Sequence, residues 1–485
     1  MNLKNLLFIV IVLSSKLAFA QYTNIPDANF KRYLQSQYGL CFNAAGLLDS
    51  TCTQIINESR LECSNKQISD LTGVHYFRNL KVLKCDLNSI SAISSLPTIL
   101  DSLFCNNNSL TQLPTLSSNL VHLDCKNNKL TTLPSLPSTL KVLDCDNNEI
   151  SAFPTLPTNL SKLYCGGNLF NNLPSLPNVL NTLNCNDSRL TGWPSLPNSL
   201  AVLQCGNSNL TSLPTLPANL KGLLCSGNRL SSLPPLPNSL IWLDCSSNAI
   251  TALPALPNNL LSLVCVSNKL TSLPVLPNGI EKIWCNKNQI ASFTSLPRSI
   301  IDLSCDSNKL TSLPALPYLL QKLYCDNNQL VALPSLPPSL FELTCNSNIY
   351  LDCVPALPNQ MRVFTAKSTR VTCIPNRPSS LVTTLPTCPK PCVLGIENQE
   401  AETAILISPN PTTHQVFSLT LPSHLETGTL VITNLLGQAL YNQVLTNTQS
   451  YEINVGFLTQ GMYVVKIMSP NQATSIQKLI VGVAE

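Results

Sequence analysis

Apolar positions recur with a period of 20 residues along most of this chain. One copy of the repeat reads Leu100-x-x-Leu103-x-Cys105-x-x-Asn108-x-Leu110-x-x-Leu113-Pro114-x-Leu116. Its cysteine returns in every unit from Cys85 to Cys345, and Cys63 lies one slightly longer step upstream. A unit this short cannot bury a hydrophobic core alone, so consecutive units must stack. The pattern therefore predicts a solenoid, which is a scaffold for a binding or display surface.

Each position of the repeat has a physical role. Leu103 and Cys105 alternate with outward residues, which predicts a short strand with both side chains facing the core. Asn108 follows the strand, where its amide can bond backbone groups of its own and neighbouring coils. The proline of Leu113-Pro114 fixes φ and favours an extended return segment. We expect a mainly β fold with parallel strands and extended returns, in roughly 16 coils about 4.8 Å apart.

The repeat resembles the bacterial leucine-rich repeat family with Leu-Pro-x-Leu-Pro returns, here with cysteine in the strand. The resemblance covers Leu61 to about Pro386 and implies a leucine-rich repeat solenoid over residues 61–386. Local departures replace the asparagine or a proline by serine or threonine, at Ser117, Ser188, Ser208 and Thr294.

The chain begins with the pattern of an export signal. Lys4 and the apolar run Leu6–Leu13 precede a small-residue cleavage site that ends at Ala20, which is typical of a signal peptide over residues 1–20. The apolar run is too short to span a bilayer, and no later stretch is long enough. We therefore expect a protein that leaves the cytoplasm and does not span a membrane.

Residues 21–60 are expected to cap the exposed end of the solenoid, because open ends expose strand edges and core. Asp27 can cap a short helix that ends at Gly39. The apolar residues at helical spacing are Phe30, Tyr33 and Leu34.

After a polar linker over residues 387–404, the chain has a second domain over residues 405–485. The leucine-proline frame vanishes there, and Gly437, Gly456 and Gly461 separate short alternating segments. Several short strands with turn signals at this spacing predict a small β-sandwich. The expected strands span residues 416–421, 429–433, 451–455, 462–468 and 477–481.

This domain resembles the type A C-terminal sorting domain of the type IX secretion system of Bacteroidetes. The motif residues are Pro409, Asn410, Pro411, Gly437, Gly461, Tyr463 and Lys478. Ser408 departs from the family, which often has an aromatic residue there. The resemblance implies passage through the periplasm, docking on the type IX secretion machinery and removal of the domain by its sortase-like protease. The product would be secreted or attached to the outer-membrane surface. Another adhesion-type β-sandwich is the alternative.

The chain has 21 cysteines, and an exported protein can form disulfides. In the repeat column, stacked cysteines have parallel Cβ vectors, which keeps the Cβ atoms too far apart for a disulfide. We therefore expect buried free thiols there, with a cross-linked column as the alternative. A metal row is disfavoured because a line of side chains cannot close a tetrahedron. Disulfides are expected to staple the solenoid ends, with Cys41 pairing to Cys52, Cys353 to Cys373, and Cys388 to Cys392.

Composition and motifs disfavour several classes of function. Charged residues make up 11% of the chain, and the net charge of +4 includes no basic run, so nucleic-acid binding is not expected. The four histidines are scattered and have no catalytic or metal-binding partner at a recognisable spacing. We expect no catalytic residues, no metal and no cofactor, and an enzyme is the least favoured interpretation.

Function is then expected on the outward strand positions. A second outward column, just after the repeat asparagine, includes Lys129 and Lys309, and solvation is the plain interpretation of that basic stripe. We expect an exported protein that binds a protein or glycan partner, and the alternative is a structural envelope or matrix protein without a discrete ligand. The candidate ligand-binding residues are Leu224, Trp242, Val264, Trp284 and Tyr324.

Overall fold

The computed structural model describes residues 21–388 and, further along, residues 406–408, 416–420, 427–434, 438–446, 450–459, 461–469 and 472–481. The chain divides into two compact units, Met1–Cys392 and Val393–Glu485. The expected signal peptide and most of the expected linker lie outside the described residues.

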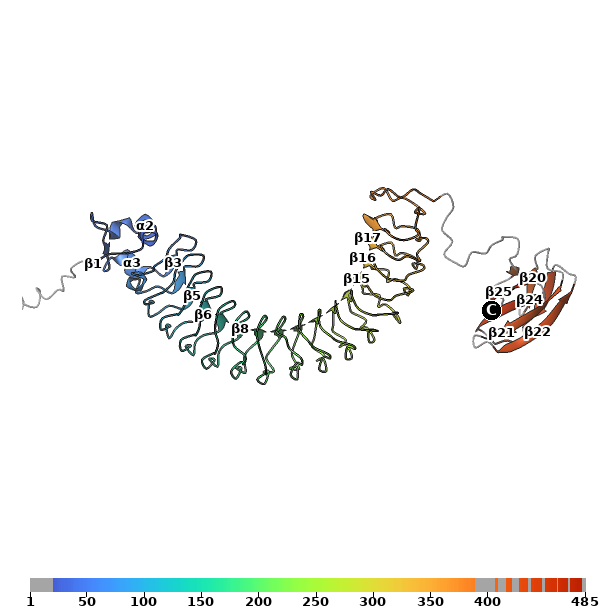
Figure 1. Ribbon diagram of the computed structural model, residues 1–485, viewed down its shortest axis with the longest axis horizontal. Helices are drawn as coiled ribbons and strands as arrows, with labels where there is room; N and C mark the ends of the chain where they lie inside the picture. The colour runs from blue at the N-terminus through green and yellow to red at the C-terminus, as the bar shows by residue number, and fades with distance from the viewer. Residues whose placement is uncertain are drawn as a thin grey trace, which may run out of the picture. The chain divides into compact units, whose positions relative to one another are not determined.

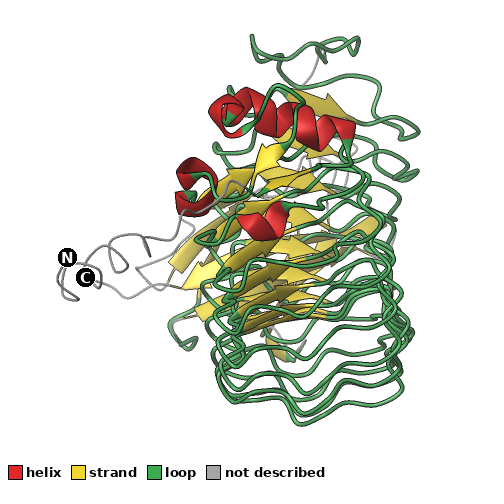
Figure 2. Ribbon diagram, turned by 90° about the vertical axis from the view of Figure 1, so that its left-hand side faces the viewer, coloured by secondary structure: helices red, strands yellow, loops and turns green. Residues whose placement is uncertain are grey.

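The first unit contains the predicted solenoid, with one parallel sheet of 16 strands in chain order. Equivalent positions pair across neighbouring coils, as in Leu103, Leu123 and Leu143. The strands line the concave side of the curved solenoid, and loops form its remaining surface (Figures 1 and 2). The strands are β3 (Arg60–Glu62), β4 (Val82–Lys84), β5 (Ser102–Phe104), β6 (His122–Asp124), β7 (Val142–Asp144), β8 (Lys162–Tyr164), β9 (Thr182–Asn184), β10 (Val202–Gln204), β11 (Gly222–Leu224), β12 (Trp242–Asp244), β13 (Ser262–Val264), β14 (Lys282–Trp284), β15 (Asp302–Ser304), β16 (Lys322–Tyr324), β17 (Glu342–Thr344) and β18 (Val363–Thr365).

The core is a stack of equivalent side chains. The middle strand residue and the cysteine after the strand are fully buried, as in Leu123 and Cys125. On the return, the proline carbonyl accepts a hydrogen bond from the leucine N–H three residues later, for example Leu200 N–H to Pro197 O at 3.0 Å. Proline has no N–H of its own, so this turn leaves no proline donor unpaired.

The repeat asparagine forms a hydrogen-bonded ladder inside the solenoid. Asn268 Nδ2 donates to Cys245 O, Cys265 O and Val266 O at 3.0, 3.2 and 3.3 Å. Its Oδ1 accepts from Ile250 N at 3.1 Å. One side chain therefore satisfies polar backbone groups of two coils that stacking has removed from water. The expectation that this amide bonds its own and a neighbouring coil is confirmed.

The ladder changes at two adjacent coils, where Ser188 and Ser208 replace asparagine. Ser208 keeps part of it, because its Oγ donates to Cys185 O of the preceding coil at 3.3 Å and accepts from Ser188 N at 3.2 Å. Ser188 Oγ donates only to Asn186 O of its own coil, at 3.3 Å. Within the described residues, the N–H groups of Phe170 and Leu190 have no acceptor, whereas their counterparts in most coils bond a ladder Oδ1. The substitutions thus weaken the connection between neighbouring coils.

The column cysteines are buried free thiols, as predicted. Several thiols donate to the strand carbonyl of the next coil, such as Cys145 Sγ to Tyr164 O at 3.4 Å. Burial raises the pKa of these thiols, to about 12 for Cys63 and well above the usual value for Cys125. They are therefore protonated and unreactive at neutral pH.

Disulfides lie near both ends of the solenoid. Cys41 bonds to Cys52, as expected, with Cα atoms 5.6 Å apart. The expected pairing of the last four cysteines is wrong, because Cys373 bonds to Cys388. The final segment makes one more coil and pairs Thr387 in parallel with Ile374, which brings Cys388 beside Cys373. Cys353 is also disulfide-bonded, and Cys392 lies outside the described residues.

The N-terminal cap contains the expected helix, α2 (Ala28–Gln37), with Phe30 and Leu34 buried. Asp27 Oδ1 accepts from Phe30 N at 2.7 Å, and its Oδ2 accepts from Ser69 N at 2.8 Å. This carboxylate therefore ties the helix to the first coil. The cap also contains β1 (Tyr22–Thr23), η1 (Gly39–Cys41), β2 (Leu48–Asp49) and α3 (Thr53–Asn57), and η2 (Val74–Tyr76) follows in the first coil.

The second unit has two antiparallel sheets that share one core, which includes Phe417 and Ile453 from the first sheet and Leu430 and Val465 from the second. The first sheet contains β19 (Leu406–Ser408), β20 (Val416–Thr420) and β23 (Ser450–Asn454). The second contains β21 (Thr427–Thr433), β22 (Ala439–Thr446), β24 (Gly461–Ser469) and β25 (Gln472–Val481). The sequence pattern did not predict β19 or β22.

Candidate ligand-binding surface

Each strand of the solenoid presents its first and third residues on the concave face, because side chains alternate across a strand. Trp242 is the first residue of β12, and it pairs with Gly222 on one side and Ser262 on the other. A Cβ on Gly222 would lie 3.5 Å from Cε3 of the tryptophan, which is an ordinary van der Waals distance, so the ring lies directly beside this glycine. Trp242 remains 50% exposed.

The other candidate residues occupy the third-residue column beside Trp242. Leu224, Val264, Trp284 and Tyr324 are all partly buried. Asp244 separates the first two and Ser304 separates the last two. The structure therefore brings the candidates onto one surface but interrupts them with polar residues, and they do not form a continuous apolar patch.

Trp284 is more constrained than its sequence position suggests. The ammonium of Lys282 lies 3.4 Å from the centroid of its ring, which is a cation–π contact. Its indole Nε1–H donates to Asp302 Oδ1 at 3.2 Å. One face and the polar edge of this ring are thus already occupied, whereas Trp242 has neither contact among the described residues.

A hollow of about 730 Å³ lies further toward the N-terminus on the same face. Phe104, Asp124, Asp144 and Tyr164 line it and follow one another in the third-residue column of β5 to β8. Sequence reasoning did not select these residues. The sequence did contain a signal for this hollow: in the third-residue column, two successive coils have an acidic residue, and the coils before and after them have an aromatic residue.

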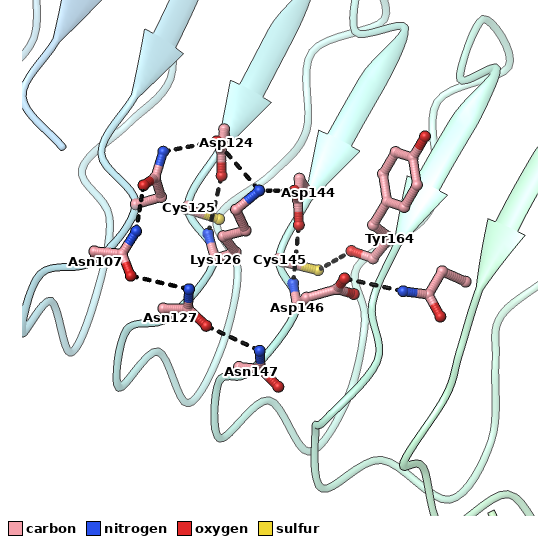
Figure 3. A network of polar contacts seen from close by, with 12 residues as sticks. Asn107, Asp124, Cys125, Lys126, Asn127, Asp144, Cys145, Asp146, Asn147 and Tyr164 are labelled. Atoms are coloured by element: carbon pink, nitrogen blue, oxygen red, sulfur yellow. Dashed lines mark hydrogen bonds and ion pairs between the residues drawn. The ribbon is translucent and has the colours of Figure 1, made fainter. Parts of the chain in front are cut away.

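The acidic residues of the hollow are paired internally (Figure 3). Lys126 Nζ lies 3.0 Å from Asp144 Oδ2 and 3.9 Å from Asp124 Oδ2. The hydrogen bond to Asp144 raises the pKa of Lys126, which keeps this bridging cation charged. Asp124 also accepts from Asn106 Nδ2 at 2.7 Å.

Asp146 and His122 lie at the margins of this network. Asp146 accepts from Gly166 N at 2.6 Å and from Asn184 Nδ2 at 2.9 Å. Burial and the nearby Asp144 raise the pKa of Asp146 to about 6 despite these donors. His122 packs against Phe104, with ring centroids 4.8 Å apart, and burial lowers its pKa, so it is largely neutral at pH 7.

The basic stripe lies outside the strands and is exposed. Lys309 makes one contact there, to Gln289 Oε1 at 3.4 Å. The stripe is therefore not part of the hollow.

The described part of the chain contains no group of three or more His, Cys, Asp or Glu residues arranged to hold a metal ion. Across the same residues, no helix is long and apolar enough to cross a membrane.

Comparison with known proteins agrees with this geometry. Residues 118–158 match a family of Leucine Rich repeats (2 copies). YopM from Yersinia enterocolitica WA-314 is 31% identical with a TM-score of 0.54, and the match covers 67% of this chain and 81% of YopM. YopM from Yersinia pestis, described as a leucine-rich effector protein, is 34% identical with a TM-score of 0.59, over 64% of this chain and 89% of YopM. This chain belongs to the bacterial leucine-rich repeat proteins.

The fold of this leucine-rich repeat protein is also similar to the functional domain of InlJ from Listeria monocytogenes, which includes a cysteine ladder. That structure is 20% identical with a TM-score of 0.57, and the match covers 96% of this chain and 99% of InlJ. No curated protein sequence matches the chain.

Residues 406–482 of the leucine-rich repeat protein match the Secretion system C-terminal sorting domain. The protein is therefore exported through the type IX secretion system to the cell surface or the medium. Among the motif residues, Gly461 begins β24, and buried Tyr463 donates to Thr459 O at 2.8 Å. Lys478 lies on β25 opposite Val464. Pro409, Asn410, Pro411 and Gly437 lie outside the described residues.

Proposed function

We propose that this leucine-rich repeat protein binds an extracellular protein or glycan with the concave face of its solenoid. The observation that carries the proposal is the half-exposed Trp242 ring, placed between a glycine and a serine of the neighbouring strands. Large aromatic side chains supply much of the binding energy where partners meet. A parallel solenoid sheet offers an extended concave surface of the kind used for recognition.

Two further features support binding rather than catalysis. The thiols of the solenoid column are buried and protonated, which makes them poor nucleophiles. The Yersinia pestis relative is described as an effector protein, and this description names no enzymatic activity. We also infer that a sortase-like protease of the secretion system removes the C-terminal domain after export, as the family resemblance implies.

The test is capture of a partner by purified, exported protein, followed by titration of that partner. Trp242→Ser places at this position the residue that Ser262 has in the next coil, so the variant should fold. We expect affinity to fall by about 30-fold, which corresponds to roughly 2 kcal/mol for one hot-spot residue. Tyr318→Ala is the matched control, because Tyr318 is 70% exposed but lies outside the sheet.

Circular dichroism establishes that both variants keep the wild-type fold. Equal affinities of wild type and Trp242→Ser would remove this residue from the site. Self-assembly of the protein without any saturable partner would contradict the proposal and favour a structural role in the envelope.

A further inference from the structure

The hollow between Phe104 and Tyr164 is separate from Trp242 and has a different lining. We propose that it is a second subsite that binds a neutral oligosaccharide. The inference rests on the proposed function, because both sites belong to the same concave face, but it names a ligand class for residues that sequence reasoning did not select.

The size and shape of the hollow suit a chain of a few sugar rings. Its volume of about 730 Å³ is within the range of small-molecule sites. Phe104 and Tyr164 lie three strands apart in one column, which corresponds to about 14 Å along the solenoid. The two aromatic side chains thus flank a short trough, and flat apolar rings pack well against the C–H faces of sugars.

The aromatic residues differ in availability. His122 packs against Phe104, and Lys84 Nζ lies 5.8 Å from the centroid of that ring. Tyr164 has no ring contact of this kind among the described residues, and its hydroxyl has no hydrogen-bond partner there. We therefore assign the main stacking platform to Tyr164, whose hydroxyl also remains free to bond a sugar.

The charge balance argues against a charged ligand of either sign. A cationic side chain would compete with Lys126, which already lies between Asp124 and Asp144. The third carboxylate, on Asp146, is held by a backbone N–H and an asparagine amide. An anionic ligand would face these carboxylates at short range, where like charges repel.

A sugar hydroxyl can both donate and accept, so it can bond groups that keep their internal partners. The lining offers both kinds of atom, namely carboxylate oxygens with spare lone pairs on Asp124 and Asp144 and donors on Lys162 and Gln204. Donors and acceptors beside an aromatic ring fit a neutral polyol better than an apolar or ionic segment.

The experiment is calorimetric titration of the full chain with defined probes. The neutral probes are hexasaccharides of β-1,4-glucose, β-1,4-N-acetylglucosamine and α-1,6-mannose. The charged comparators are oligogalacturonate and a lysine-rich peptide. We expect at least one neutral probe to bind with a Kd below about 1 mM, and neither comparator to bind comparably.

Tyr164→Asn is the deciding variant, because Asn184 occupies the same column one coil further on and the fold accepts it. We expect this variant to lower the affinity for the neutral probe at least about tenfold. Tyr318→Ala is the matched control and should leave that affinity within about twofold, because Tyr318 is 70% exposed and lies outside the sheet. Circular dichroism shows that each variant is folded.

Three results would overturn the inference: no neutral probe binds, a charged comparator binds more tightly than every neutral one, or Tyr164→Asn leaves the affinity unchanged. If Trp242→Ser abolishes capture of a partner while no oligosaccharide binds, the inference fails and the proposed function stands. If the oligosaccharide binds as expected but Trp242→Ser changes no interaction, the assignment of Trp242 fails and the hollow is the binding site.

Discussion

The asparagine ladder gives a quantitative test of what holds the coils together. Replacing Asn268 by serine removes the Oδ1 that accepts from the Ile250 N–H at 3.1 Å, and no other acceptor for this N–H is found among the described residues. Cys245 O keeps a second donor, Asn248 Nδ2 at 3.0 Å, so this carbonyl is not left unpaired. One buried donor therefore loses its partner, which costs about 1–3 kcal/mol. The smaller side chain adds a cavity cost, so we expect roughly 2–4 kcal/mol in total.

The reverse change is available in the same molecule. Ser188→Asn would provide an acceptor for the Phe170 N–H and new donors for carbonyls of two coils, by analogy with the bonds of Asn268. We expect this variant to be more stable than wild type by about 1 kcal/mol. The pair of substitutions thus tests one interaction in both directions.

Hydrogen exchange with mass spectrometry is the appropriate assay, because stability in a repeat protein is distributed among neighbouring coils. Protection should fall for peptides that contain Ile250 in Asn268→Ser, and should rise for peptides that contain Phe170 in Ser188→Asn. Denaturant midpoints provide the global comparison. Unchanged protection in Asn268→Ser, or a loss of protection in Ser188→Asn, would refute the argument that the ladder amide connects the coils.

Three further predictions concern export, thiols and pH. Deleting the residues after about Thr403 should leave the solenoid folded but hold it in the periplasm. Cell fractionation tests this, and a truncated protein found at the surface or in the medium would contradict it. Alkylation of denatured, unreduced protein should label 15 cysteines by intact mass, matching the free thiols, whereas labelling of only a few would indicate a cross-linked column. The pKa of Asp146 is raised to about 6, so its folded form holds a proton that the unfolded chain releases, and stability should fall as pH rises from about 4 to 6. After allowance for solvent screening, the expected loss of folding free energy is about 1 kcal/mol. Asp146→Asn should flatten this part of the stability–pH curve. An unchanged slope in the variant would show that Asp146 does not cause the pH dependence.

The repeat was predictable because each of its positions has one dominant physical constraint. Leu103 and Cys105 face the core by alternation, and the ladder asparagine follows from the need to pair buried backbone groups. The helix capped by Asp27 was predictable for the same reason, since a local hydrogen bond defines its first turn.

The elements that were missed depend on tertiary context. Burial alternates along β22, but its apolar residues do not follow that alternation, because Leu440 and Val444 lie on the exposed side and Gln443 on the more buried side. The sequence therefore lacks the pattern that would have indicated the strand. The bond between Cys373 and Cys388 depends on the parallel pairing of Thr387 with Ile374, which no spacing of cysteines encodes. The lining of the hollow depends on which side chains lie side by side in neighbouring coils. The sequence also does not show that Lys126 lies between the carboxylates of Asp124 and Asp144.

The common internal frame of the coils bears on how the spacing of the two proposed binding surfaces can change during evolution. Ser188 and Ser208 lie between the coil of Tyr164 and the coil of Trp242. Coils on either side share one internal frame, so a duplication or deletion of one whole period keeps every buried partner in register. Such an event between the two surfaces would change their separation in steps of about 4.8 Å without altering either one. The distance between the two surfaces can therefore change in evolution while the side chains that form each surface stay the same.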